Sequence, residues 1–384
     1  MRPPVTPELE AVERAFVDRG YRLWFVGGCV RDALMGEAPK DVDLCTDATP
    51  DEQQALYRSL GLVCYPTGIE FGTLTVVIGA EPYEITTLRT ETEHDGRHAT
   101  VAFTRDLHED LARRDLTINA MAMTFQGLLI DPFGGERDLD AGVVRFVGDA
   151  SERIEEDHLR ILRFFRFHGR YGRGRLDPAA AAACALFGHG LRAISGERIW
   201  VEMKKVVAHD SGPRMVREMR RLGLLDHLEV SGEVLPERMD IAHAHTRDPV
   251  VLMSALAKNW PPIAKRWRWS KSETALAKFL ENRLYGPPTL KNLKYLLACE
   301  KASPAYAEAW ARATGVPEVF TEVSSWPVPA LPINGDDFVA KGFKPKEIGG
   351  GLMAARLTWA LSGYTMNRED MLTALDGVRL APGG

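Results

Sequence analysis

Cysteine is scarce in this sequence, and the few cysteines are scattered. There are five, none of them in a CxxC pair, and an odd, dispersed set argues against both a disulfide framework and a structural zinc site. Long hydrophobic runs are also missing. No stretch of about 18 apolar residues occurs, and the first ten residues, MRPPVTPELE, contain no apolar signal-peptide core. We therefore expect a cytoplasmic protein with no membrane partner.

Net positive charge is lacking as well. The chain carries a formal charge of −5 over 384 residues, so a nucleic-acid partner has to be argued from local clusters of basic residues. Glycine and proline are close to ordinary usage, with 34 and 23 residues, which excludes collagen-like and disordered classes. The length predicts two or three domains.

The first third of the chain mixes short strand patterns with helical ones. Strands are predicted at residues 22–26, 41–45, 73–78 and 83–88, with weaker candidates at 128–131 and 143–147. Helices are predicted at residues 8–19, 30–35 and 51–60.

After Asp149 the pattern becomes helical, with predicted helices at residues 151–171, 178–187, 195–208 and 212–224. This helical pattern continues as far as the C-terminus. The predicted fold class is therefore α+β, a small α/β head followed by an all-helical remainder.

A glycine turn leads from the first predicted strand into a short helix. Gly27 and Gly28 leave room for a phosphate beside the helix N-terminus, where the helix dipole favours an anion. Arg31, about one turn further on, could donate two hydrogen bonds to the same phosphate. Alone, the pattern also fits a plain turn followed by a surface arginine.

Two aspartates follow in a strand-like segment, where aspartate is disfavoured. Residues i and i+2 of a strand face one side, so Asp41 and Asp43 would lie roughly 6–7 Å apart at Cα and repel each other without a divalent cation. Placed after the glycine turn, the pair predicts the metal-binding half of a phosphoryl-transfer site. Glu84 is the candidate third carboxylate, with pairing to a basic residue as the alternative.

Two arginine clusters lie further along the chain. Adjacent Arg113 and Arg114 could grip a triphosphate, and Asp115 could either orient an arginine or cap the following helix. In EEDHLRILRFFRF the arginines fall on one side of a helix and the apolar residues on the other. Residues 153–175 hold seven arginines against three acids. That excess favours ligand binding, with an ordinary amphipathic helix as the alternative.

Taken in order, these motifs resemble one family. GGCVRD, DVD, FGTLTVV with YEITTLR, EDLARRDLTINAMA, DPFGGERDLDAGVVRFVG and EEDHLRILRFFRF are similar to motifs of the class II tRNA CCA-adding enzymes. These bacterial and eukaryotic enzymes belong to the polymerase-β-like nucleotidyltransferase superfamily. The similarity covers residues 20–200 well, and beyond them it rests on helical texture. Leu116 and His158 depart from the usual residues without removing a functional group.

The resemblance implies a nucleotidyltransferase head at residues 1–137, a neck that selects the nucleotide at 138–208, and a body and tail that bind tRNA at 209–384. It implies catalysis by Asp41, Asp43 and the candidate Glu84, with two Mg²⁺ ions held at Asp41 and Asp43. C, C and A would be added from CTP and ATP to the tRNA 3′ end, at the acceptor stem. The implied nucleotide-binding residues are Gly27, Gly28, Arg31, Arg113, Arg114, Glu156, Asp157, Arg160, Arg163 and Arg166.

The neck motif allows a physical test of this base specificity. A carboxylate accepts from an exocyclic amine, and a guanidinium donates to a ring nitrogen, so Asp157 with Arg160 suits both cytosine and adenine. Guanine and uracil present a keto oxygen and an N–H along that edge, and each buried mismatch costs about 1–3 kcal/mol. The pair therefore predicts addition of C and A without a nucleic-acid template.

Two other readings remain open on the sequence. A poly(A) polymerase of the same superfamily shares the head motifs, and a non-catalytic helical RNA-binding protein would explain the neck arginines but not the paired aspartates. Residues 90–108 are polar and resemble the flexible loop that the family needs for the switch from C to A. That resemblance favours complete CCA addition.

Overall fold

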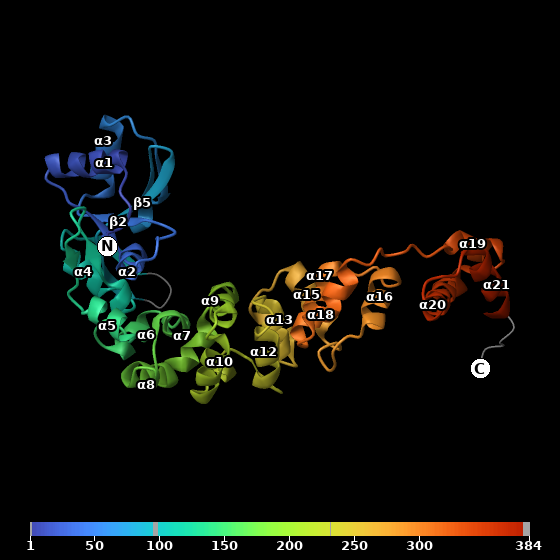
Figure 1. Cartoon of the computed structure of the whole chain (residues 1–384). Helices are drawn as coiled ribbons and strands as arrows, with labels where there is room; N and C mark the ends of the chain where they lie inside the picture. The colour runs from blue at the N-terminus through green and yellow to red at the C-terminus, as the bar shows by residue number, and fades with distance from the viewer. Residues whose placement is uncertain (1, 95–98, 231, 379–384) are drawn as a thin grey trace. The chain divides into compact units, whose positions relative to one another are not determined.

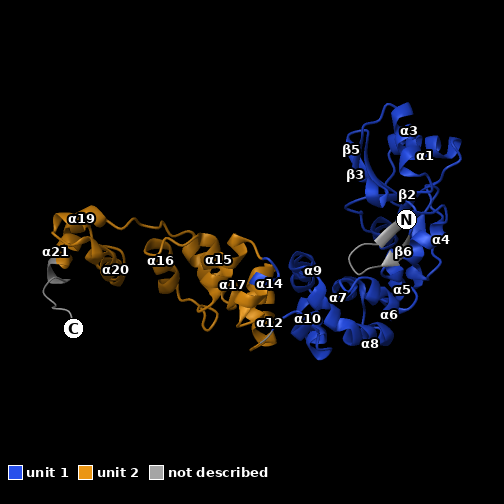
Figure 2. Ribbon diagram, turned by 180° about the vertical axis from the view of Figure 1, so that it is seen from behind, with its two compact units in different colours: residues 1–231, 265–268 blue, residues 232–264, 269–384 orange. Residues whose placement is uncertain are grey.

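The computed structural model describes residues 2–94, 99–230 and 232–378. The chain divides into two compact units, one of residues 1–231 with 265–268 and one of residues 232–264 with 269–384 (Figure 2). No helix in the described ranges is both long enough and apolar enough to span a membrane.

A mixed seven-stranded sheet forms the centre of the head, in the order β3-β4-β5-β2-β1-β8-β9. Strands β2 and β5 pair in parallel, and the other neighbours pair antiparallel. The strands are β1 (Leu23–Val26), β2 (Asp43–Thr46), β3 (Cys64–Gly68), β4 (Thr73–Ile78), β5 (Glu81–Thr87), β8 (Ala122–Met123) and β9 (Leu129–Ile130). The α/β head predicted from the sequence is confirmed.

Alternation along β1 gives the sheet two buried faces. Leu23 and Phe25 enter a core with residues of α1 (Pro7–Asp18), α2 (Gly28–Leu34) and α3 (Pro50–Ser59). Trp24 and Val26 point the other way, into a smaller core with α4 (Leu107–Ala112). Accordingly α1 and α3 lie together, away from α4 (Figure 1). Each such buried side chain stabilises the fold by roughly 1.5–3 kcal/mol.

Helices follow the head along the rest of the first unit (Figure 1). On α7 the apolar side chains Ile161, Leu162, Phe164 and Phe165 are fully buried, which leaves the arginines between them on the other face. The helices are α5 (Gly135–Ala141), α6 (Ala150–Glu156), α7 (Arg160–Tyr171), α8 (Pro178–Phe187), α9 (Gly196–Ala208), α10 (Gly212–Arg221) and α11 (Leu224–His227).

From residue 236 onward the described chain is helical apart from its connections and one isolated bridge. The helices are α12 (Pro236–His243), α13 (Pro249–Leu256), α14 (Trp260–Arg266), α15 (Lys271–Leu280), α16 (Leu290–Ala298), α17 (Pro304–Ala313), α18 (Pro317–Ser324), α19 (Gly335–Ala340), α20 (Pro345–Leu361) and α21 (Arg368–Val378). The predicted α+β class is thereby confirmed.

The structure corrects the sequence reading of the neck. The single helix predicted at residues 151–171 is two helices, because Asp157 adopts an extended backbone and its carboxylate accepts the amide of Leu159 at 3.1 Å. Such a local side-chain bond competes with helix continuation. The strand predicted at residues 143–147 is also wrong: only Phe146 forms a bridge, with Leu116.

Two predictions in the head need correction as well. Strand β2 begins at Asp43, so Asp41 lies in a bend before it rather than within a strand at residues 41–45. The polar segment at residues 90–108, which was expected to resemble a flexible loop, contains regular secondary structure where it is described. It contains the antiparallel pair β6 (Arg89–His94) and β7 (Ala99–Phe103), then the start of α4. Residues 95–98 of this prediction lie outside the described chain.

Candidate active site

A cavity of about 930 Å³ lies within the first unit, between the head and helices α7 and α9. It is at the upper end of the range for ligand pockets. Residues singled out in the sequence that line it are Gly27, Gly28, Arg31, Asp43, Arg113, Arg114, Asp157, Arg160, Arg163 and Arg166. The structure adds Lys40, Asp115, Asn119, Leu159, Phe167, Arg170, Arg198, Lys205, Ala208 and His209. Basic side chains outnumber acidic ones, which suits a polyanionic ligand.

The glycine turn brings the backbone to the edge of this cavity. Gly27 has a φ of 71°, a left-handed conformation that favours glycine. A Cβ there would lie 2.9 Å from Nη1 of Arg114. The turn therefore keeps the end of β1 within contact distance of Arg114.

Two of the predicted carboxylates lie together where β2 begins, and of Asp41, Asp43 and Glu84 only Asp43 lines the cavity. Asp43 and Glu84 are directly paired across the parallel strands β2 and β5. Although Asp43 is exposed, partial desolvation first, and then the charges of Glu84 and Asp41, raise its pKa against the opposing charge of Arg114. A bound cation would relieve this mutual repulsion.

The arginine pair is held by an acid that the sequence reading missed. Asp110, 1% exposed, lies 2.6 Å from Nη2 of Arg113 and 3.1 Å from Nη2 of Arg114. Burial raises the pKa of Asp110, but the charges of Arg114 and Arg113 outweigh it, so that the pKa falls below its usual value. The i,i+3 and i,i+4 spacing within EDLARR was the available signal.

Asp115 orients an arginine, the first of its two predicted alternatives. Its Oδ2 accepts from Nε of Arg163 at 2.6 Å, and its Oδ1 accepts from Asn119 and from the Leu116 amide. Burial raises the pKa of Asp115, yet Arg163 and these donors hold it below the usual range. This ion pair joins the head to α7.

Substituting Asp115 by alanine is expected to lower the free energy of unfolding by about 3–5 kcal/mol, because it leaves Arg163 without its buried partner. A depressed native pKa means that the stabilisation is complete above the ordinary aspartate pKa of about 3.9 and is lost as the pH falls through the native value. The difference between wild type and Asp115→Ala in denaturant titrations should therefore narrow in acid. Glu37→Ala, which breaks the exposed pair with Arg170 at 2.9 Å, is the control and should cost about 1 kcal/mol or less. A small, pH-independent decrease in the free energy of unfolding of Asp115→Ala would contradict a stabilising role for the Asp115–Arg163 ion pair.

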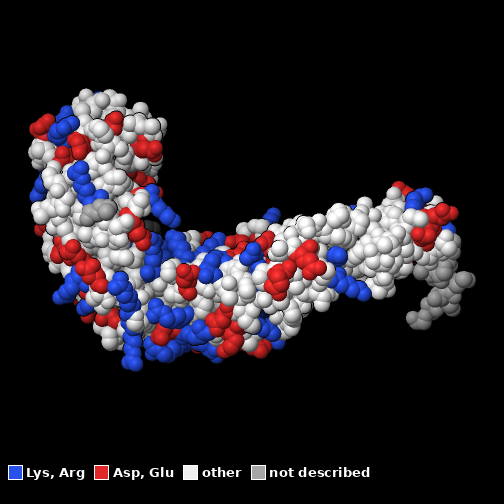
Figure 3. All heavy atoms as spheres, in the orientation of Figure 1, with Lys and Arg blue, Asp and Glu red and all other residues white. Residues whose placement is uncertain are grey.

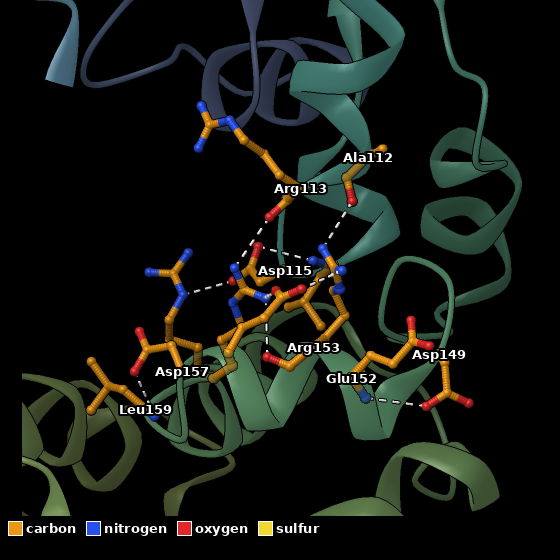
Figure 4. A network of polar contacts seen from close by, with 12 residues as sticks. Ala112, Arg113, Asp115, Asp149, Glu152, Arg153, Asp157 and Leu159 are labelled. Atoms are coloured by element: carbon orange, nitrogen blue, oxygen red, sulfur yellow. Dashed lines mark hydrogen bonds and ion pairs between the residues drawn. The ribbon is translucent and has the colours of Figure 1, made fainter. Parts of the chain in front are cut away.

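Arginines of the neck also reach the backbone of the head (Figure 4). Nη2 of Arg160 donates to the carbonyl of Arg113 at 3.1 Å, and Nη1 of Arg153 donates to that of Ala112 at 3.2 Å. Glu156 forms ion pairs with both Arg153 and Arg160 and, unlike Arg160, does not line the cavity.

Asp157 and Arg160 both line the cavity but are fixed by different partners. Asp157 forms an ion pair with Arg198 of α9 at 2.7 Å and accepts a hydrogen bond from the Leu159 amide. Arg160 is held by Glu156 and by backbone carbonyls. Each is thus oriented independently of the other. Arg198 was missed in the sequence because it lies 41 residues further along the chain.

A sheet that places Asp43 in the wall of a strongly basic cavity is typical of enzymes that act on phosphorylated substrates. Comparison with known proteins narrows this class. Residues 23–145 match the family model "Poly A polymerase head domain", and residues 175–231 match "Probable RNA and SrmB-binding site of polymerase A".

Curated relatives extend the match to almost the whole chain. The mitochondrial CCA tRNA nucleotidyltransferase 1 of Mus musculus is 35% identical over 397 residues, covering 96% of this chain and 89% of the relative, and that of Homo sapiens gives the same figures. The chain belongs to the family of CCA-adding tRNA nucleotidyltransferases, as its motifs predicted.

Solved structures agree. The Bacillus stearothermophilus CCA-adding enzyme in complex with CTP has a TM-score of 0.78 at 27% identity and covers 98% of both chains. The Thermotoga maritima CCA-adding enzyme complexed with tRNA shares the fold, with a TM-score of 0.71 at 21% identity over 98% of this chain and 96% of that one.

Proposed function

We propose that this enzyme adds C, C and A in turn to the 3′ end of tRNA, using CTP and ATP and no nucleic-acid template. In each step the terminal 3′-hydroxyl oxygen attacks the α-phosphate, a new phosphodiester forms, the α–β bond breaks and pyrophosphate leaves. The observation that carries this proposal is the basic cavity that joins Asp43, the arginine pair and the neck couple Asp157 and Arg160.

The carboxylates fit a Mg²⁺ site. Mg²⁺ is commonly held by one or two carboxylates together with substrate phosphates. Asp41 and Asp43 would supply these oxygens. The described residues form no site of three protein ligands, and Mg²⁺ bound in this way does not need one. When bound, the metal would supply charge stabilisation at the attacking and leaving oxygens. Glu84 is our candidate for the third carboxylate, on the evidence of its pairing with Asp43.

The protein's own groups would bind and orient the nucleotide. Arg113 and Arg114, fixed by Asp110, would face the triphosphate beside the glycine turn at Gly27 and Gly28. Asp157 would accept from the exocyclic amine of C or A, and Arg160 would donate to the adjacent ring nitrogen. Arg163 and Arg166 would add positive charge further along α7, and Glu156 would position Arg160.

A basic surface beside the cavity supports tRNA as the partner. In Figure 3 Lys and Arg side chains gather over α9 and α10, with some acids among them. The sequence of α10, GPRMVREMRR, alternates arginines with the buried Met215, Val216 and Met219. Arginines on the outer face of such a helix suit contacts with phosphates. We propose the domain roles accordingly, with the head at residues 1–137, the neck at 138–208 and a tRNA-binding body and tail at 209–384.

We propose a reducing compartment, the cytoplasm, as the location of the enzyme. The supporting observation is that all five cysteines are free thiols. The Mus musculus and Homo sapiens relatives are named mitochondrial. Fractionation of cells that produce the tagged chain would distinguish the two locations.

The decisive assay uses labelled tRNA that lacks its terminal CCA. With CTP alone we expect two residues to be added, with CTP and ATP together three, and with GTP or UTP none. A long adenylate tail made from ATP alone would instead identify a poly(A) polymerase. Binding of tRNA without any extension would support a non-catalytic role.

A further inference from the structure

One aromatic ring in the cavity wall is surrounded by guanidinium groups. The ring of Phe167 lies 4.4 Å from the guanidinium carbon of Arg166, 5.3 Å from that of Arg31 and 5.5 Å from that of Arg163. All three distances are within the range of cation–π attraction. Phe167 is half-buried, and all four residues line the same cavity.

These three cations come from two elements and repel one another. Arg31 belongs to α2 of the head, and Arg163 and Arg166 belong to α7. The pKa of Arg166 is lowered, chiefly by burial, and further by the positive charges of Arg163 and Arg31 against the opposing Glu202. Like charges this close together require attractive contacts that offset their mutual repulsion.

Each arginine already has an acid on the protein side. Arg31 lies 2.7 Å from Asp32, Arg163 lies 2.6 Å from Asp115, and Arg166 lies 3.1 Å from Glu202. Polar contacts link two of the arginines, because Asn119 accepts from Arg31 and donates to Asp115, which accepts from Arg163. Among the described residues, however, no acid forms an ion pair with all three arginines. The Phe167 ring, by contrast, lies within cation–π distance of all three guanidinium groups.

The ring itself is fixed by a second aromatic residue. Tyr171, one turn along α7, stacks on Phe167 with ring centroids 6.0 Å apart and planes 18° apart, and it also lies 4.6 Å from the guanidinium carbon of Arg31. Its hydroxyl donates to Asp32 at 3.1 Å. Burial raises the pKa of Tyr171 to about 12, so this donor stays protonated at neutral pH.

We propose that Phe167 is a positioning residue that gathers Arg31, Arg163 and Arg166 into one phosphate-binding group at the head–neck junction. The proposal rests on the proposed function and adds to it how the phosphate site is assembled. Two substrates carry the phosphates that this group would bind: the triphosphate of the incoming nucleotide and the phosphodiester at the 3′ end of the tRNA.

The test compares four variants in steady-state CTP incorporation into tRNA lacking CCA. Phe167→Leu keeps an apolar side chain but removes the ring, and Phe167→Tyr and Phe167→Trp restore one. Phe165→Leu, a fully buried ring on the same helix, is the matched control for loss of an aromatic side chain. Thermal unfolding is measured for all four.

We expect Phe167→Leu to raise KM roughly tenfold or more, as the loss of three cation–π contacts predicts, with a smaller change in kcat. Tyrosine and tryptophan should return KM to within about threefold of wild type. A rise in KM for CTP identifies the triphosphate as the ligand, and a rise in KM for tRNA identifies the phosphodiester. Phe165→Leu should lower the melting temperature without changing either KM.

Two results would overturn the proposal. One is a folded Phe167→Leu protein with both KM values unchanged. The other is a loss that tyrosine and tryptophan fail to restore, since that points to shape rather than to the ring's charge distribution. If the wild type itself adds no C or A to tRNA, the proposed function fails first, and binding of inorganic tripolyphosphate to wild type and Phe167→Leu still tests the arginine cluster.

Discussion

Replacing Asp43 by alanine is expected to reduce nucleotide incorporation by roughly a thousandfold or more, because charge stabilisation by a bound metal contributes several kcal/mol to the transition state. The thermal stability of the protein should not fall. The raised pKa of Asp43, caused by partial desolvation and by the neighbouring carboxylates, indicates that its charge is unfavourable in the native state without a cation. The melting temperature of metal-free Asp43→Ala should therefore equal or exceed that of the wild type.

Three measurements separate this catalytic role from a structural one. They are single-turnover incorporation of CTP, tRNA binding by filter retention, and thermal unfolding with and without Mg²⁺. Asp18→Ala, at an exposed position at the end of α1, is the matched control and should behave as wild type. A stably folded Asp43→Ala enzyme that retains turnover would refute the metal role. Asp41→Ala should give the same pattern.

The second large effect is expected on base selection. Asp157→Ala should reduce the preference for C and A over G and U by roughly ten- to a hundredfold, since one buried hydrogen bond to the exocyclic amine is worth about 1–3 kcal/mol. The affinity for tRNA should change much less. The measurement is the ratio of kcat/KM values for CTP and UTP on the same tRNA.

Asp157 has a second partner, and this provides the control. Its carboxylate pairs with Arg198 at 2.7 Å, so alanine removes an ion pair as well as the acceptor. Arg198→Ala removes the same ion pair and keeps the carboxylate. Selectivity should survive in Arg198→Ala and be lost in Asp157→Ala. An equal loss in both, or no loss in Asp157→Ala, would remove the templating role.

Much of the fold could be predicted because local patterns determine it. Strand β4 was placed at its observed bounds by its alternation of threonine with apolar residues, and α3 was placed by the start signal Thr49-Pro50, which the structure shows as a capping box between Thr49 and Glu52. Short or interrupted elements were predicted less well: β9 falls within the predicted segment 128–131, but β8 was missed. Strand β8 has only two residues, and the break before α7 depends on one side-chain bond from Asp157.

The site was partly predictable for a similar reason. Glycines, paired aspartates and clustered arginines identify themselves by residue type, and most of them line one cavity. The residues that hold them in place cannot be recognised by residue type. In the sequence Asp110 looks like any other helix residue, and only the structure shows it buried against Arg113 and Arg114. Phe167 was interpreted only as part of an arginine-rich helix. Contacts between segments far apart in sequence, such as Arg31 with α7, follow from the fold alone.

The most direct test of this account is a crystal structure with Mg²⁺ and CTP bound. We predict a metal ion about 2.0–2.1 Å from carboxylate oxygens of Asp41 and Asp43 and from the triphosphate. The cytosine edge should face Asp157 and Arg160. A triphosphate bound away from the glycine turn, or aspartates turned apart with no metal between them, would contradict it.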